Sequence, residues 1–112
     1  MSNNLDWEDF EKIEIRVGTI IEANDFPEAR KPAYQLTIDF GSEIGVKKSS
    51  AQITKRYSKQ ELIEKQIIGV VNFPTKQIGN FMSECLVLGI VNGDDIILLT
   101  SDKTVENGLK IA

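Results

Sequence analysis

The sequence contains no histidine and only one cysteine, and these two scarcities exclude several kinds of chemistry. Histidine is the commonest acid–base catalyst near neutral pH and the commonest metal ligand. Its absence rules out His-dependent catalytic triads and Cys/His zinc sites. The lone Cys85 permits no intrachain disulfide, which favours a cytoplasmic protein. Because Cys85 lies in an apolar stretch with no histidine to activate it, we expect a buried, unreactive thiol.

Long apolar runs are missing as well. No segment of the 112 residues approaches the length of a membrane-spanning helix, and the polar, acidic N-terminus lacks the features of a signal peptide. The glycines at 41 and 45 lack the Gly-Lys-Ser/Thr ending of a phosphate-binding loop. We therefore expect a non-enzymatic chain with no cofactor, no metal site and no membrane insertion, folded as a single domain over residues 1–112.

Strand patterns dominate the rest of the chain. Residues 13–23 and 34–40 alternate between apolar and polar side chains, as half-buried strands do. Residues 67–73 and 81–91 are nearly continuous apolar runs, and an Asn-Gly-Asp-Asp turn follows the second run. The remaining expected strands are an unusually polar one at 46–51, a returning one at 96–100 and a short closing one at 105–112.

One helix is expected between the third and fourth strands. Residues 54–66 look helical, with a capping box formed by Ser58 and Glu61.

Glycine inside a strand indicates a bulge or a close backbone approach, and Gly18 would let the first strand bend sharply. The order of elements predicts an all-β fold with one short helix, namely an OB-fold five-stranded barrel with a C-terminal strand extension.

Residues 46–57 form a basic stretch in a chain whose formal net charge is −4. Two interpretations stay open, a solvated loop or a surface that holds an anionic or polar partner. Strand alternation places Lys47 and Lys48 on opposite faces, so both cannot line one groove without a bulge. Four aromatic residues are candidates for stacking, although core packing is the expected role of each: Tyr34, Tyr57, Phe73 and Phe81. Phe73 stands out, since it precedes Pro74 at the end of a strand.

Several linear runs resemble the tRNA-binding-domain family: FEKIEIRVGTI at 10–20, FPEARKPAY at 26–34, SSAQITKRY at 49–57 and VVNFP at 70–74. Within that family, residues 38–57 and 81–89 are most similar to the CsaA branch, described as export-related chaperones. The family's His-Pro-x-Ala-Asp-Lys-Leu-Tyr run is replaced here by the run at 26–34, and its Ser-x-Gly-Met by Ser83-Glu84-Cys85-Leu86. These departures from the family's pattern indicate a remodelled groove, which weakens the expectation of tRNA specificity.

The same resemblance implies an OB-fold homodimer built from an N-terminal arm at 1–12 and a C-terminal extension at 90–112. From the residues alone, Trp7 and Phe10 form either a helical turn that covers the fold or an arm that packs on a partner chain. The groove is expected to bind unfolded preproteins or peptides, with tRNA as the alternative ligand and a structural module without a ligand as the third. The candidate groove residues are Lys47, Lys48, Ser49, Ser50, Gln52, Lys55, Arg56, Asn72, Phe73, Lys76, Met82, Ser83 and Glu84.

Overall fold

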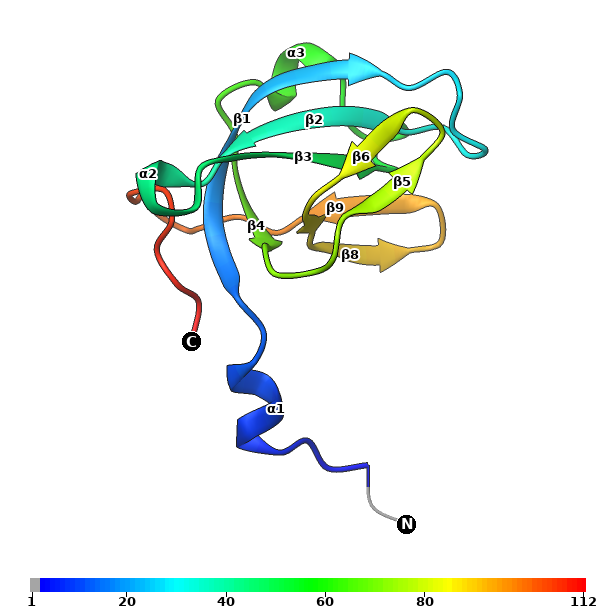
Figure 1. Cartoon of the computed structure of the whole chain (residues 1–112). Coiled ribbons are helices and arrows are strands. Elements are labelled where there is room, and N and C mark those ends of the chain that lie inside the picture. Colours follow the sequence, from blue (N-terminus) through cyan, green and yellow to red (C-terminus); the bar gives the residue numbers. More distant parts are fainter. Residues whose placement is uncertain (1–2) are drawn as a thin grey trace.

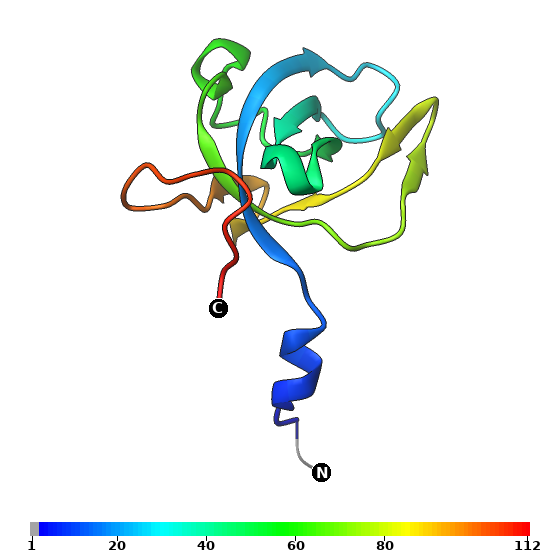
Figure 2. The ribbon, with the colours of Figure 1, turned by 60° about the vertical axis from the view of Figure 1, so that its left-hand side comes forward.

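The computed structural model describes residues 3–112, which form a small barrel with a helical arm projecting from one end (Figures 1 and 2). The barrel is organised around β1 (Ile15–Asp25), which has a neighbour on each edge. Its first half pairs with β4 (Gln66–Val70) and its second half with β2 (Tyr34–Asp39). Because the two halves pair on different edges, β1 bends and starts the closure of the barrel.

Gly18 and the bend of β1 are separate features. The register of β1 against β2 shifts between Ile20 and Glu22, so the irregularity lies after Gly18, where the sequence had placed the bend. Gly18 instead marks a close approach, since a Cβ there would lie 2.7 Å from side-chain carbons of Ile38 and Phe40. Of the two roles expected for a glycine inside a strand, a bulge or a close approach, Gly18 shows the close approach, here to core side chains.

The five strands of the barrel follow the order β3-β2-β1-β4-β7, with β3 at Val46–Ala51 and β7 at Leu86–Val87. All neighbouring pairs are antiparallel. The helix α3 (Lys59–Leu62) lies between the third and fourth strands, which confirms the predicted OB-fold. The alternating pattern of residues 34–40 buries Leu36, Ile38 and Phe40 completely, as one face of β2 and its extension.

The predicted helix over residues 54–66 was too long. Its capping box is present, because Ser58 accepts from the backbone N–H of Glu61 and the Glu61 side chain accepts from that of Ser58. The helix ends after Leu62, because Ile63 is extended and Glu64 has a φ of 70°. The Glu64 N–H then donates to the carbonyl of Ile20 at 2.7 Å, which ties the chain to β1. Two further short helices are α1 (Trp7–Glu11) and α2 (Gly41–Ile44).

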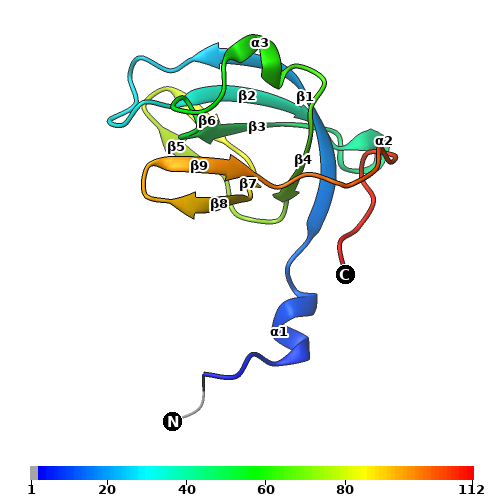
Figure 3. The same cartoon turned by 180° about the vertical axis from the view of Figure 1, so that it is seen from behind.

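The single strand predicted over residues 81–91 was wrong, since this segment changes partner twice. Its first part, β6 (Phe81–Ser83), pairs with β5 (Lys76–Ile78), for which the sequence predicted no strand. Its middle part is β7, and its last part, β8 (Gly89–Asn92), pairs with β9 (Asp95–Leu98). The predicted turn between β8 and β9 is confirmed, and Figure 3 shows this hairpin beside β7.

The C-terminal segment runs back along the first half of β1, but the predicted closing strand is only a single bridge between Arg16 and Lys110. Backbone bonds from Gly108 to Val17 and from Ile111 to Ile15, at 2.7 and 2.9 Å, fasten it there. At the other terminus, α1 stands clear of the barrel and has no buried residue. The arm is therefore tied to the barrel mainly at its base.

Candidate ligand-binding groove

A groove of about 380 Å³ opens between the end of β3, the β4–β5 connection and the β5–β6 hairpin. It brings together side chains that are far apart in the sequence. Five of them were predicted from the sequence: Ser50, Gln52, Phe73, Lys76 and Ser83. Four others were not predicted: Pro74, Ile78, Cys85 and Leu86. The lining of the groove therefore combines apolar and polar side chains.

Phe73 supplies the most exposed ring of this groove. It lies beyond the end of β4, and 55% of its surface is accessible. The other aromatic candidates have structural partners: the Tyr34 hydroxyl donates to the Tyr57 carbonyl at 2.8 Å, and the Tyr57 hydroxyl accepts from the N–H of Leu98. Phe81 packs on Phe26 with a centroid separation of 5.3 Å. Of the four candidates, Phe73 is the one with a freely accessible ring.

The β5–β6 hairpin determines which of its side chains meet the groove. Lys76 pairs with Ser83 and Ile78 with Phe81, so these residues share one face of the hairpin. Gln77 and the exposed Met82 pair on the opposite face. The structure thus separates Met82 from the groove to which the sequence had assigned it. The Lys-Gln-Ile spacing at 76–78 was the signal that would have revealed Ile78.

Ser49 and Glu84 close the barrel, which corrects their assignment as groove contacts. Ser49 is 1% exposed and its hydroxyl donates to the Cys85 carbonyl at 3.0 Å. Glu84 uses its own N–H to bond the Lys48 carbonyl at 2.7 Å, while its side chain accepts from the Lys48 N–H at 3.0 Å. A further bond runs from the Ser50 N–H to the Ser83 hydroxyl. These contacts join β3 to residues 83–85 and complete the circuit of strands.

Cys85 is buried at this seam, as predicted. Burial disfavours the thiolate and raises the pKa of the thiol to about 11. The bond with Ser49 opposes this shift without cancelling it. The thiol is therefore protonated at neutral pH, and its uncharged side chain forms part of the groove lining.

The two lysines of β3 face opposite sides of the sheet, as strand alternation requires. Lys47 lies opposite Ile38 and Lys48 opposite Thr37, in a ladder without a register shift. Lys47 is half-buried and Lys48 is exposed. One strand therefore cannot present both charges to the same ligand.

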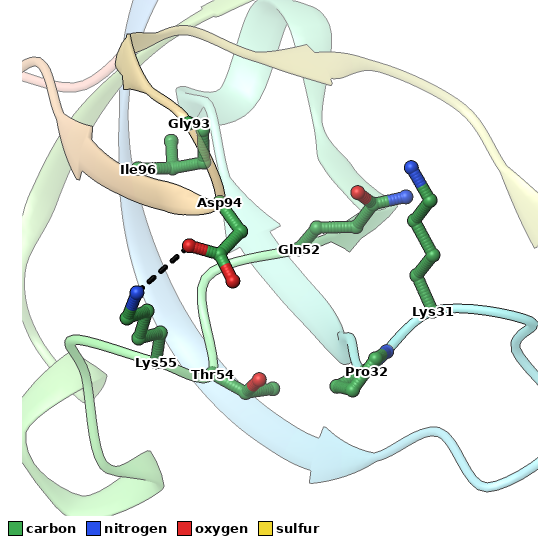
Figure 4. Close-up of a pocket in the computed structure, with 8 residues that line it drawn as sticks. All are labelled: Lys31, Pro32, Gln52, Thr54, Lys55, Gly93, Asp94 and Ile96. Carbon is green, nitrogen blue, oxygen red and sulfur yellow. Dashed lines mark hydrogen bonds and ion pairs between the residues drawn. The ribbon is translucent and has the colours of Figure 1, made fainter.

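Lys55 lines a second cavity of about 550 Å³, which shares Gln52 with the groove, and Arg56 follows it in the chain. Figure 4 shows Lys55 and Asp94 on one side of this cavity and Lys31 on the other, with Gln52 between them. The Lys55 ammonium donates to Asp94 at 2.8 Å. This hydrogen bond raises the pKa of Lys55 and lowers that of Asp94, so both groups are charged at neutral pH.

Asn72, also predicted to line the groove, instead anchors the N-terminal arm. Its amide donates to the Lys12 carbonyl at 2.7 Å and accepts from the Glu14 N–H at 3.0 Å. Both partners lie just before the start of β1. Asn72 therefore fixes the base of the arm immediately before Phe73.

Residues 3–112 bring no three His, Cys, Asp or Glu side chains together in a way that would hold a metal ion. None of the helices that these residues form has the length and apolarity needed to cross a bilayer.

A five-stranded antiparallel barrel with an open groove beside its third strand defines the chain as an OB-fold module. Residues 15–110 match the family model described as "Putative tRNA binding domain", and the chain belongs to this family. Its similarity to solved structures is more specific than the family alone.

Two solved structures share nearly the whole chain. The chaperone CsaA of Bacillus anthracis str. Ames is 50% identical, with 97% of this chain and 99% of that chain covered and a TM-score of 0.92. The CsaA chaperone protein of Picrophilus torridus is 60% identical, with 97% and 100% covered and a TM-score of 0.92. The chain is therefore a CsaA-like member of the tRNA-binding-domain family.

Longer proteins contain a related segment. The methionine–tRNA ligase of Pyrococcus horikoshii is 37% identical over 105 residues, which are 94% of this chain and 14% of the ligase. That of Thermotoga maritima is 31% identical over 110 residues, or 98% of this chain and 17% of the ligase. The chain thus spans about a seventh of the length of the curated relatives that it matches.

Proposed function

We propose that this chain is a binding protein for unfolded polypeptides, including preproteins on their way to export, and that it acts in the cytoplasm without catalysing a reaction. The observation that carries the proposal is the mixed lining of the groove. Exposed Phe73 with Ile78 and Leu86 offers apolar contact, while Ser50, Gln52 and Ser83 offer hydrogen bonds. An extended peptide needs both, because its backbone is polar and its alternate side chains need pockets.

The similarity to two CsaA chaperones over nearly their full length supports this proposal. The second candidate is tRNA binding, which the family model and the related segment of the methionine–tRNA ligases favour. Several lysines remain for phosphate contact, among them Lys31, Lys48 and Lys76. We place tRNA second because the chain is acidic overall and two of its expected phosphate contacts, Lys55 and Arg56, form ion pairs within the chain.

Binding of a permanently unfolded polypeptide to the full chain tests the proposal, with Phe73→Ala as the variant. Removing a ring that becomes buried against the ligand forfeits about 1.5–3 kcal/mol, so the affinity should fall at least about tenfold. Met82→Ala is the matched control, because Met82 is also exposed but faces away from the groove. Equal effects of the two substitutions would contradict binding in this groove.

Salt separates the two candidate ligands. Phosphate contacts release counterions, so the affinity for tRNA should fall steeply between low and near-physiological salt, whereas apolar binding of polypeptide should persist. If tRNA binding persists at near-physiological salt and polypeptide binding does not, tRNA becomes the main ligand.

The chain is also proposed to act as a homodimer, with residues 1–12 and 90–112 at the interface. The apolar face of α1 supports this proposal, because Trp7 is 81% exposed and Leu5 is exposed beside it. Leu5, Trp7 and Phe10 border a cavity together with Ala112, so the arm and the C-terminus meet at one apolar surface. Exposed Ile90 and Val91 add apolar surface on β8.

A further inference from the structure

Two consecutive acids at the β8–β9 turn hold the two cations that follow β3. Asp94 accepts from the Lys55 ammonium at 2.8 Å. Asp95 accepts from two nitrogens of Arg56, at 2.8 and 2.5 Å, which makes this pair bidentate. The four formal charges cancel, although residues 55 and 56 by themselves present two positive charges.

The stability of the fold is a weak reason for this arrangement. The side chains of Lys55, Arg56 and Asp94 are all well exposed, and Asp94 is 85% accessible. Exposed ion pairs contribute little to folding, because water and salt screen the two charges. Asp95 is the better enclosed acid, at 19% accessible.

The location of the pairs gives a stronger reason. Lys55 and Asp94 line the cavity that shares Gln52 with the groove (Figure 4). A nucleic-acid strand that follows the groove past Gln52 would reach Lys55 and Arg56 and use them as phosphate contacts. At that point it meets two carboxylates that already occupy the same donors. A neutral peptide backbone meets no such repulsion.

We propose that Asp94 and Asp95 are specificity-determining residues that occupy Lys55 and Arg56 in place of phosphate and so disfavour nucleic acid at this end of the groove. The inference rests on the proposed function, since it explains how a member of a tRNA-binding family prefers polypeptide. It assigns the discrimination to repulsion of the wrong ligand, which complements attraction of the right one.

The experiment compares the full-length wild type with D94N/D95N, using labelled unfractionated tRNA over a series of salt concentrations. Each cation released to phosphate steepens the dependence of log affinity on log salt by about 0.7–0.9. The double variant should therefore bind tRNA more tightly at low salt, with a slope steeper by about 1–2. D94N alone, at the more exposed position, should show about half of this increase and covers the case in which the double variant fails to fold.

The matched control is E43Q/E64Q, which removes two negative charges that form no ion pair with Lys55 or Arg56. If the control steepens the salt dependence as much as D94N/D95N does, net charge explains the effect and the proposal is overturned. An unchanged slope in D94N/D95N and D94N overturns it too. Binding of an unfolded polypeptide of near-zero net charge is measured in parallel and should be the same in all variants. Failure of the wild type to bind that polypeptide would overturn the proposed function, whereas the tRNA slopes decide the role of the two acids.

Discussion

The hydroxyl of Ser49 lies in an interior that is otherwise apolar among the residues described. Its bond to the Cys85 carbonyl crosses the seam where β3 meets residues 83–85. Without the hydroxyl, that buried carbonyl loses a donor, which costs about 1–3 kcal/mol. Ser49→Ala should lower the free energy of unfolding by this amount in urea denaturation. Ser50→Ala, which removes the neighbouring hydroxyl from the groove side, should change it by less than about 0.5 kcal/mol. Equal losses would contradict the closing role of Ser49.

Cys85 predicts a second effect, on the pH dependence of stability. Its thiol pKa rises from an ordinary value near 9.0 to about 11 in the folded chain. Between these values the unfolded chain binds fewer protons than the folded one, so the contribution is present below pH 9 and is lost as pH rises toward 11. The difference in unfolding free energy between wild type and Cys85→Ala should therefore shrink over this range. A difference that stays constant from pH 8 to 11 would contradict burial of the thiol.

Among the elements, β1 depends on one close contact. A methyl group at position 18 would enter the space of Ile38 and Phe40, which are both fully buried. Overpacking a core costs about 1–3 kcal/mol. Gly18→Ala should therefore lower the midpoint of urea denaturation, while Glu22→Ala on the exposed part of the same strand should have little effect. If both variants unfold at the wild-type midpoint, the approach of Gly18 to the core is looser than described.

The elements also explain what could be predicted from sequence. The alternation at 34–40 predicted the buried face of β2, because one face of a strand recurs every second residue. The run at 81–91 was misread as one strand, because continuous apolar residues carry no sign of a change of partner. The helix predicted at 54–66 was too long. Its end is set by the left-handed backbone at Glu64, whose N–H bonds the carbonyl of Ile20, a residue distant in sequence.

The sequence could predict groove residues that are simply exposed. It could not predict residues whose role is fixed by a hydrogen-bond partner distant in the sequence. Phe73 was singled out because a ring at the end of a strand, before Pro74, can stand at the mouth of a groove, although core packing was its expected role. Ser49, Lys55 and Arg56 looked equally available as ligands for a partner, but their own partners lie 36 and 39 residues further along the chain. No local pattern contains that information.

At the scale of the whole molecule, the arm predicts assembly. Trp7 is the only tryptophan of the chain and is almost fully exposed in the single chain. In the proposed homodimer it would be buried, so its fluorescence should shift to the red as the protein is diluted and the dimer dissociates. W7A/F10A should sediment as a monomer, with its barrel still folded by circular dichroism. A wild type that sediments as a monomer at micromolar concentration would contradict the homodimer.

Asn72 connects the N-terminal arm to the groove. Its amide holds Lys12 and Glu14 at the base of the arm, and the next residue is Phe73 in the groove. A ligand that displaced Phe73 would act on the same backbone that orients the arm through Asn72. In the proposed homodimer, ligand binding and dimer formation would then be thermodynamically linked, and linkage works equally in both directions. A polypeptide that tightens the dimer must itself bind the dimer more tightly than the monomer, by the same factor.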